Sequence, residues 1–210
     1  MFELLKGLNI YLIGMMGAGK STIGKLLAAN SDYAFLDTDE SIQKLFEQHD
    51  EIGGQVTTPS IAEIFTDIGE PEFRNIETQV LVKISADARL VETQVLAEVS
   101  AHTRLIVATG GGLPISRENW NHLHQGLVVW IDPSVEILVN RLQGDTTRPI
   151  LATNEPIHPK ITRILAERSQ MYAQADVRIS FDDDLPPETV VERIYTAIPT
   201  VLKTPPSIPD

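Results

Sequence analysis

The sequence predicts an α/β domain in which a parallel β-sheet carries helices on both faces. Short apolar runs typical of buried strands alternate with helical segments along the chain. A glycine-rich loop follows the first apolar run and leads directly into a helix. The length of 210 residues suits one such domain, with or without a small lid.

The strands and helices of this domain can be assigned in order. Apolar runs predict strands at residues 8–13, 34–37, 105–108, 127–131 and 176–180. Helices are expected at residues 20–29, 40–48, 161–174 and 187–198, and Asp132-Pro133 is expected to cap the helix behind the fourth strand. Residues 49–59 contain Gly53-Gly54 and Pro59 and are expected to form a loop.

A capping box marks the start of a further helix. Ser60 and Glu63 have its spacing, so a helix is expected from there to about residue 67, with Gly69 ending it and Pro71 opening the next. Residues 143–160 are polar and contain proline, which is typical of a loop or lid. The tail at residues 199–210 contains four prolines, and we expect it to be flexible.

Composition limits the classes of function. The net charge of −12 and the pI of about 4.8 argue against nucleic acid or an anionic membrane as a partner. No run of about 18 apolar residues is present, and the N-terminus is too short and too acidic for a signal peptide. The absence of cysteine excludes a disulfide framework and cysteine-based zinc sites, and the histidines show no ligand spacing. We therefore expect a cytoplasmic protein.

The loop at residues 14–22 fits the pattern G-x-x-x-x-G-K-[ST] between a strand and a helix. Its glycines would let the backbone wrap a phosphate group, at which N–H groups and the helix N-terminus then point. Lys20 would reach the β- and γ-phosphates of a nucleotide, and the Ser21 hydroxyl would ligate Mg²⁺. An ordinary strand-to-helix turn is the alternative. The residues expected to bind nucleotide are Gly17, Ala18, Gly19, Lys20, Ser21 and Thr22.

Two more motifs follow strands. Asp37 and Asp39 lie two residues apart, so their side chains would point to opposite faces if the second strand continues. One would then face a metal ion and the other an acceptor hydroxyl, although a helix-capping role fits one of them equally well. Gly110-Gly111-Gly112 follows the third strand, which favours either a close approach of backbone to ligand or a plain loop.

Four arginines are candidates for anion binding. Arg74 lies in the first turn of the helix opened by Pro71, where a cation is unfavourable with the helix dipole, so an anionic partner is expected. A solvated surface arginine is the alternative. Arg141, Arg148 and Arg168 fall on or beside the lid-like stretch, and Arg148-Pro149 is suited to clamp a transferring phosphate.

Residues 77–90 are repeated at residues 92–105, with 9 of 14 positions identical at an offset of 15. The repeat cannot simply lengthen one helix, because 15 further residues would move its end by about 22 Å and prevent the strand at residue 105 from rejoining the sheet. We therefore expect a break near residues 86–90, with one copy forming either an additional helix or a surface excursion.

The chain resembles the shikimate kinases, P-loop enzymes that phosphorylate shikimate in aromatic amino-acid biosynthesis. The matching blocks run in family order over about residues 8–180 and lie at residues 14–22, 35–39, 60–65, 69–77, 108–112, 147–151 and 166–168. The resemblance implies a fold like that of the nucleoside monophosphate kinases, a five-stranded parallel sheet in the order 2-3-1-4-5. It also implies a single domain at residues 1–198, a substrate-binding helical region at about 40–77 and a lid at about 143–160.

The resemblance assigns a role to each matching residue. Asp39 would be the catalytic base, with Lys20 and Arg148 as further catalytic groups. Ser21 would ligate Mg²⁺, with Asp37 holding the ion through a water molecule, and ATP would also contact Arg141 and Arg148. Shikimate would be bound by Asp39, Phe65, Phe73, Arg74, Glu77, Gly111, Gly112 and Arg168. A monomer with ATP and Mg²⁺ as its cofactors is expected.

Two other interpretations fit parts of the sequence. The first is another small-molecule P-loop kinase, acting on gluconate or on a nucleoside monophosphate. The second is a non-catalytic relative, against which the presence of Lys20, Asp37, Asp39, Arg74, Arg148 and Arg168 speaks. The family ordinarily has one copy of the segment that is duplicated at residues 77–105. If this member departs from the family geometry, we expect it to do so around Arg74 and Glu77, next to the duplication.

Overall fold

The computed structural model describes residues 5, 7–49, 56–86, 104–144 and 155–202. Its centre is a sheet of five parallel strands in the order β2-β5-β1-β6-β7. Counted along the chain within this sheet, the order is 2-3-1-4-5, which confirms the expected topology. The strands are β1 (Ile10–Ile13), β2 (Ala34–Asp37), β5 (Leu105–Ala108), β6 (Leu127–Pro133) and β7 (Val177–Phe181).

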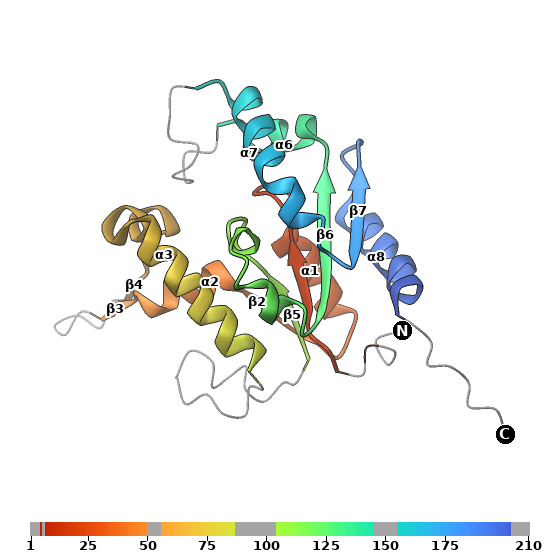
Figure 1. Cartoon of the computed structure of the whole chain (residues 1–210), viewed down its shortest axis with the longest axis horizontal. Coiled ribbons are helices and arrows are strands. Elements are labelled where there is room, and N and C mark those ends of the chain that lie inside the picture. The colour runs from red at the N-terminus through yellow and green to blue at the C-terminus, as the bar shows by residue number, and fades with distance from the viewer. Residues whose placement is uncertain (1–4, 6, 50–55, 87–103, 145–154, 203–210) are drawn as a thin grey trace.

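Helices pack against both faces of this sheet. In Figure 1, α2 and α3 lie to the left of the strands and α8 lies to the right. The helices are α1 (Lys20–Ala29), α2 (Thr38–Leu45), α3 (Ile61–Ser85), η3 (Leu113–Ile115), α5 (Trp120–Leu123), α6 (Val135–Leu142), α7 (Ile157–Tyr172) and α8 (Pro187–Val201).

Two hydrophobic clusters fill the space between sheet and helices, and the central strand divides its side chains between them. Ile10 and Leu12 of β1 pack with residues of α1, α6 and α8, whereas Tyr11 and Ile13 pack with residues of α2, α3 and α5. Successive side chains of a strand point to opposite faces, and here both faces are buried. This is why β1 appears in the sequence as an unbroken apolar run.

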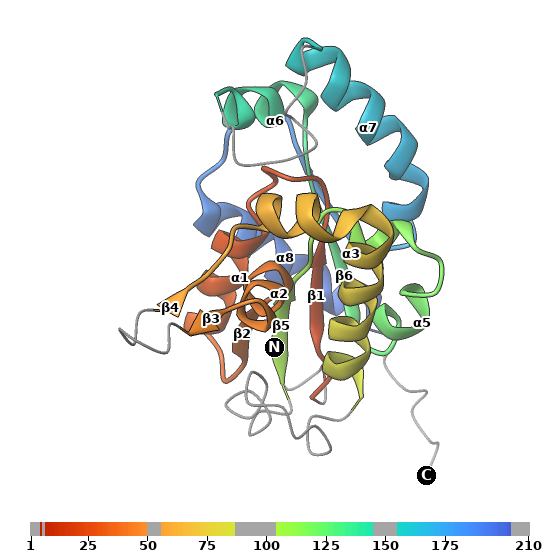
Figure 2. The same ribbon diagram turned by 90° about the vertical axis from the view of Figure 1, so that its left-hand side faces the viewer.

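The carboxyl ends of the parallel strands meet at one edge of the sheet. The loop at residues 14–19 leaves β1 there, Asp37 ends β2, and the triple glycine follows β5. Figure 2 shows α6 and α7 above this edge, and α3 running alongside the sheet. Segments that are far apart in the sequence are therefore gathered where ligands of open α/β sheets bind.

Several expected boundaries differ from the structure, and four of the differences bear on its interpretation. Residues 49–59 are not simply a loop, because β3 (Gln48–His49) pairs in antiparallel fashion with β4 (Val56–Thr57). Helix α2 begins at Thr38, two residues early, α7 begins at Ile157, inside the expected lid, and α8 runs on to Val201, into the expected tail. Proline at the third position of α7 is compatible with its first turn, where a backbone N–H has no partner within the helix.

Asp132 does not cap α6, contrary to expectation. It remains in β6, where it accepts hydrogen bonds from the guanidinium of Arg178 on the neighbouring strand β7, with 2.7 Å from Nε to Oδ2. Ser134 takes the N-cap position instead. Burial raises the pKa of the Asp132 carboxyl, while the Arg178 charge opposes this shift. Asp132 therefore serves to join two strands.

Helix α3 is two helical segments joined at a kink, as the sequence predicts. Ser60 and Glu63 form the capping box, with both reciprocal hydrogen bonds present. Gly69 has φ of 79° and ψ of 164°, outside the helical region, and Pro71 follows as one of the first residues of the second segment. The second segment ends at Ser85, where a break between the repeated copies is expected, and the next residue is the C-cap.

Several expectations concern residues outside the described part of the chain. These are the structure of the second repeat copy up to residue 103, the lid at residues 145–154 with Arg148, and the tail beyond residue 202. The division into a domain, a lid and a tail therefore stays a prediction. Among the described helices, none is both long and apolar enough to cross a membrane.

Candidate active site

The loop at residues 14–19 has a backbone that only glycine adopts without strain. Gly14, Gly17 and Gly19 have φ of 136°, 77° and 93°, in the region that other residues avoid. A Cβ at Gly14 would also lie 2.3 Å from the carbonyl oxygen of Ile131 on β6. The glycine spacing is therefore required by the path of the loop, which turns sharply from β1 into α1.

Lys20 is the first residue of α1 and reaches back across this loop. Its Nζ donates hydrogen bonds of 2.9 Å to the carbonyl oxygens of Gly14 and Met15, and the residue is only 9% exposed. No side chain caps the N-terminus of α1 in the described structure. The positive end of the helix dipole and a buried ammonium thus face the same loop, which suits a phosphate chain.

A cavity of about 370 Å³, called here the donor cavity, opens beside the loop. The loop and the first turn of α1 line one side of it, with Asp37 and Asp39 next to them. The other side is formed by Arg141 of α6 and by side chains around the start of α8, namely Phe181, Leu185, Pro187 and Val190. The cavity therefore has a polar end for phosphates and a more apolar end.

Arg141 is held between the loop and the segment that precedes α8. Its Nη1 donates to the carbonyl oxygen of Gly17 over 3.1 Å, and its Nε donates to Oδ1 of Asp184 over 3.1 Å. Asp184 lies between β7 and α8, so Arg141 is anchored within its own wall by Asp184 and joined to the P-loop wall by Gly17. Sequence reasoning selected Arg141 but not Asp184.

The side-chain oxygens of Ser21 and Asp37 form a close pair at the polar end of the donor cavity. The Ser21 hydroxyl donates to Oδ2 of Asp37 over 2.5 Å. The other carboxylate oxygen of Asp37 accepts from the backbone N–H of Asp39 over 3.0 Å, and Asp37 is the N-cap of α2. The capping and the metal-binding interpretations of Asp37 are therefore compatible, because each uses a different oxygen of the same carboxylate.

A second cavity of about 530 Å³, called here the acceptor cavity, adjoins the first. It lies among α2, α3, α7 and the loop after β5. Three residues line both cavities: Met16, Asp39 and Gly111. The acceptor cavity is otherwise lined by Gln43, Ser60, Ile61, Phe65, Glu70, Phe73, Arg74, Glu77, Gly110, Gly112 and Arg168.

Asp39 reaches its place by a route that differs from the sequence argument. The strand does not continue past Asp37, so the alternation of side chains along a strand does not apply. Asp39 instead lies in the first turn of α2, and this turn directs it to the junction of the two cavities. The expected division of roles between Asp37 and Asp39 stays a prediction, and the helical turn replaces strand alternation as its geometric basis.

The triple glycine provides flat backbone on which charged side chains rest. A Cβ on Gly112 would lie 1.9 Å from Nη1 of Arg74. A Cβ on Gly110 would lie 2.8 Å from Oε1 of Glu77 and 2.9 Å from Oδ1 of Asp39. The close approach expected at this motif is therefore made by the protein's own side chains, and a side chain at either position would push them away.

Arg168 and Tyr172, one turn apart on α7, both hold the middle glycine. Nη1 of Arg168 donates to the carbonyl oxygen of Gly111 over 3.1 Å, and the Tyr172 hydroxyl donates to the same oxygen over 2.7 Å. Arg168 is 8% exposed and Tyr172 is fully buried. Burial raises the pKa of the Tyr172 hydroxyl, so it remains a hydrogen-bond donor at neutral pH.

Arg74 and Glu77 form the charged centre of the acceptor cavity. Nη1 of Arg74 donates to Oε2 of Glu77 over 2.7 Å, and the Glu77 side chain is 2% exposed. Burial raises the pKa of the Glu77 carboxyl. The charge of Arg74 opposes this shift most strongly, while the nearby charge of Asp39 adds to it. The anionic partner expected for Arg74 is present, and within the described structure it is supplied by the protein itself.

Comparison with known proteins identifies the family. The family model described as shikimate kinase matches residues 16–91 and 87–199, which together make up most of the chain.

The chain belongs to the shikimate kinase family. A curated shikimate kinase from Trichormus variabilis is 45% identical over 203 residues, which cover 97% of each chain. One from Gloeobacter violaceus is 43% identical over 192 residues, 91% of this chain and 93% of that one. A solved structure titled shikimate kinase from Acinetobacter baumannii in complex with shikimate is 29% identical, with a TM-score of 0.74, and covers 95% of this chain and 97% of that one.

More distant kinases share the fold alone. A gluconokinase from Sinorhizobium meliloti aligns with a TM-score of 0.52 at 16% identity, covering 93% of this chain and 94% of that one.

The two segments matched by the shikimate kinase model overlap at residues 87–91. The first repeat copy lies within one matched segment and the second copy within the other, so the family match is interrupted where the two copies meet.

Most of the site residues named from the sequence come together in this shikimate kinase family member. Those around the donor cavity are Gly17, Ala18, Gly19, Lys20, Ser21, Thr22, Asp37 and Arg141, and those around the acceptor cavity are Asp39, Phe65, Phe73, Arg74, Glu77, Gly111, Gly112 and Arg168. Arg148 lies outside the described residues. Their catalytic and binding roles remain proposals.

Sequence reasoning missed other residues of the two cavities. Met16 occupies a variable position of the P-loop pattern, and Gln43 and Ile61 carry no chemical signal of their own, so only the structure shows that they line the acceptor cavity. Glu70 had a usable signal, because it lies four residues before Arg74 on a helix and the spacing favours an ion pair. Tyr172 has the corresponding spacing to Arg168, but nothing in the sequence indicates their shared acceptor, Gly111.

Proposed function

We propose that this protein is a shikimate kinase that transfers the γ-phosphoryl group of ATP to the 3-hydroxyl of shikimate. The products are shikimate 3-phosphate and ADP, in the branch of metabolism that leads to chorismate and the aromatic amino acids. Family membership supports the activity. The observation that carries it is the position of Asp39, which lines both the donor and the acceptor cavity.

In this proposal Asp39 accepts the proton of the attacking hydroxyl. The hydroxyl oxygen forms a bond to the γ-phosphorus, the bond to the bridging oxygen of ADP breaks, and the carboxylate of Asp39 carries the proton away. Phosphoryl transfer depends mainly on alignment and on neutralising negative charge. Lys20 and the N-terminus of α1 supply positive charge on the donor side of Asp39, and Arg74 and Arg168 supply it on the acceptor side.

We assign the Mg²⁺ of the nucleotide to Ser21 and Asp37. A hydroxyl and a carboxylate 2.5 Å apart offer the hard oxygen ligands that Mg²⁺ prefers. Such an ion takes its other ligands from water and phosphates, so no cage of several acidic residues is required, and the described residues contain no group of three or more. When bound, Mg²⁺ neutralises charge that develops on the phosphates.

Three further parts of the proposal rest on sequence. Arg148, in the stretch matched to the family lid, closes on the phosphates as a further cationic group beside Lys20. Arg141 contacts the adenine nucleotide from the opposite wall, as its hydrogen bond to Gly17 supports. The protein acts as a cytoplasmic monomer on a small molecule, without nucleic-acid or membrane partners, in keeping with its net charge of −12.

One assay tests the proposal against its competitors. ADP release is measured with purified protein, MgATP, and shikimate, gluconate or a nucleoside monophosphate as the acceptor. We expect turnover with shikimate and none with gluconate or the nucleoside monophosphate. Turnover only with one of the other acceptors contradicts the substrate assignment, and no turnover with any acceptor favours the non-catalytic interpretation.

A further inference from the structure

Arg74 is shared by two glutamates in the acceptor cavity. Its Nη1 donates to Glu77 over 2.7 Å, and its Nη2 donates to Glu70 over 3.1 Å. A substrate carboxylate that binds an arginine in the favourable two-pronged geometry uses two N–H groups side by side. Both terminal nitrogens of Arg74 are already engaged by carboxylates of the protein itself.

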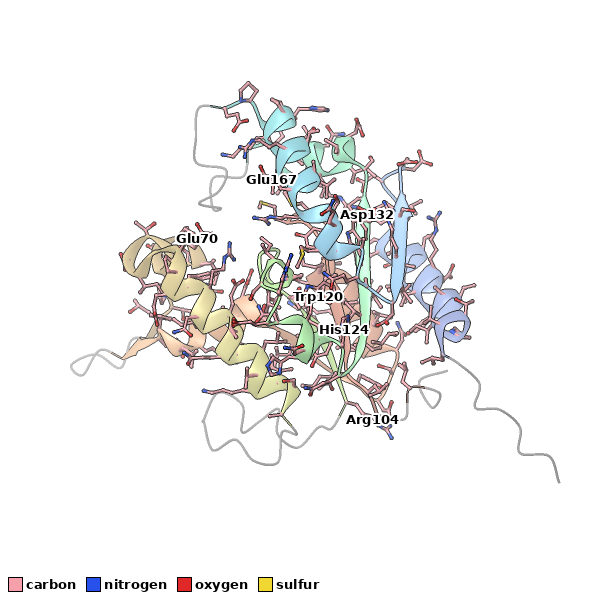
Figure 3. All side chains as sticks on the ribbon, viewed as in Figure 1. Glu70, Arg104, Trp120, His124, Asp132 and Glu167 are labelled. Carbon is pink, nitrogen blue, oxygen red and sulfur yellow. The ribbon has the colours of Figure 1, made fainter. Side chains whose placement is uncertain are left out.

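The two glutamates differ sharply in how firmly they are held. The Glu77 side chain is 2% exposed and lies beneath the guanidinium, against Gly110. The Glu70 side chain is 62% exposed and follows directly after the kink at Gly69. Figure 3 labels Glu70 on the upper part of α3. An ion pair so exposed is weak and exchanges readily, whereas the buried pair is fixed.

The acceptor cavity contains more negative than positive side chains. Its lining contains three carboxylates, Asp39, Glu70 and Glu77, against two guanidinium groups, Arg74 and Arg168. An anionic acceptor therefore enters a cavity whose own charges do not favour it. Of these three carboxylates, Glu70 is the one whose side chain can leave Arg74 and enter solvent. Asp39 and Glu77 lie deeper in the cavity, next to Gly110.

We propose that Glu70 is a built-in competitor for Arg74 that sets how strongly the cavity binds any carboxylate. It occupies Nη2 of Arg74 and must be displaced by the carboxylate of the acceptor, so it weakens the binding of every carboxylate. Simple organic acids, which offer nothing but a carboxylate, are thereby kept out. An acceptor with hydroxyls that reach Asp39 gains enough from these further contacts to displace Glu70. This inference rests on the proposed function, because it takes shikimate as the acceptor.

The test replaces Glu70 by glutamine and uses a neighbouring glutamate as the matched control. Glu70→Gln keeps the length of the side chain but removes its charge. Glu72→Gln makes the same charge change two residues later on α3, where Glu72 contacts Asn75 and not Arg74. Steady-state KM for shikimate and the inhibition constant of benzoate, a simple carboxylate, are measured for the wild type and both variants. Methyl shikimate, which has no charge, serves as the neutral ligand.

In Glu70→Gln we expect KM for shikimate and the inhibition constant of benzoate to fall together by about two- to five-fold, the range set by an exposed ion pair. Methyl shikimate should gain less, and Glu72→Gln should match the wild type. An unchanged or raised KM in Glu70→Gln relative to Glu72→Gln overturns the inference, since Glu70 would then be absent from the competition or would orient Arg74 instead.

The failure of this inference is distinguishable from the failure of the proposed function. Wild-type turnover of shikimate decides the proposed function before any variant is made. If the wild type does not turn over shikimate, calorimetric titration of benzoate into the wild type and Glu70→Gln still tests the competition. Tighter benzoate binding by the variant supports it, and equal binding overturns it.

Discussion

The two halves of the site are built in different ways. The donor half is made mainly of backbone within nine consecutive residues, 14–22, to which Asp37 at the end of β2 adds a carboxylate that is hydrogen-bonded to Ser21. The acceptor half is made of side chains from α2, α3 and α7, resting on glycine backbone after β5. A phosphate chain is the same in every nucleotide and can be recognised by one local motif. A specific small molecule needs groups of the right type from several directions.

This contrast also divides the site into parts that respond differently to change. Asp39 belongs to both halves, and Ser21 and Asp37 belong to the donor half. Arg74, Glu77 and the glycine platform belong to the acceptor half. If the division is real, a substitution in one half should alter the kinetic constant of one substrate and spare that of the other.

The largest effect is expected for Asp39→Asn, which removes the proposed base at the junction of the cavities. We expect kcat to fall by about 10²- to 10⁴-fold, the usual contribution of general base catalysis, while calorimetry shows ATP binding close to that of the wild type. Glu40→Gln, at the next residue, is the control, because Glu40 is exposed and pairs with Lys25. Equal losses of kcat and ATP affinity would mean that Asp39 has a structural role.

Substitutions of Asp37 separate its two roles. Asparagine is as good an N-cap as aspartate, so Asp37→Asn should keep its melting temperature, whereas Asp37→Ala should lose about 0.5–2 kcal/mol of stability. Both should raise the Mg²⁺ concentration needed for half-maximal activity, by about 10- to 100-fold. Thermal melts and Mg²⁺ titrations give the two readouts. A normal Mg²⁺ requirement in Asp37→Asn would leave capping as its only function.

Gly112→Ala addresses the acceptor half alone. The added methyl group collides with the flexible end of Arg74 and not with backbone, and Gly112 has φ of −94°, so the fold should be retained. Displacing Arg74 removes a charged hydrogen bond to the acceptor, and KM for shikimate should rise about tenfold or more. KM for ATP should stay near the wild-type value. A comparable rise in both constants would contradict the division into halves.

The smallest effect is expected from deleting residues 77–91, the first repeat copy. The buried residues of this copy in α3 are Glu77, Val80, Leu81 and Ile84, and the second copy offers Glu92, Val95, Leu96 and Val99 at the same spacing. The deletion should therefore give an active enzyme, slightly less stable because one buried isoleucine becomes valine. Deletion of residues 92–106 is the matched control. A folded but inactive protein in the first case would show that the first copy is indispensable to the site.

The sequence by itself determined the fold class, the order of the strands through the family resemblance, and the loop at residues 14–22 that forms the main part of the donor half. These features are local: glycines that must take positive φ, a lysine at the start of a helix, and apolar runs long enough to be buried strands. The capping box at Ser60 and the kink at Gly69 were predictable for the same reason, because neighbouring residues fix both.

Tertiary structure alone decided how the acceptor half is assembled. Asp39 reaches the junction through a helical turn and not along a strand, and Gly111 is held by two side chains that follow it by more than fifty residues. Asp39 of α2 and Glu77 of α3 meet over Gly110, which follows β5. Such contacts join residues far apart in the chain, and no periodicity or spacing encodes them, since they depend on how the helices pack over the edge of the sheet.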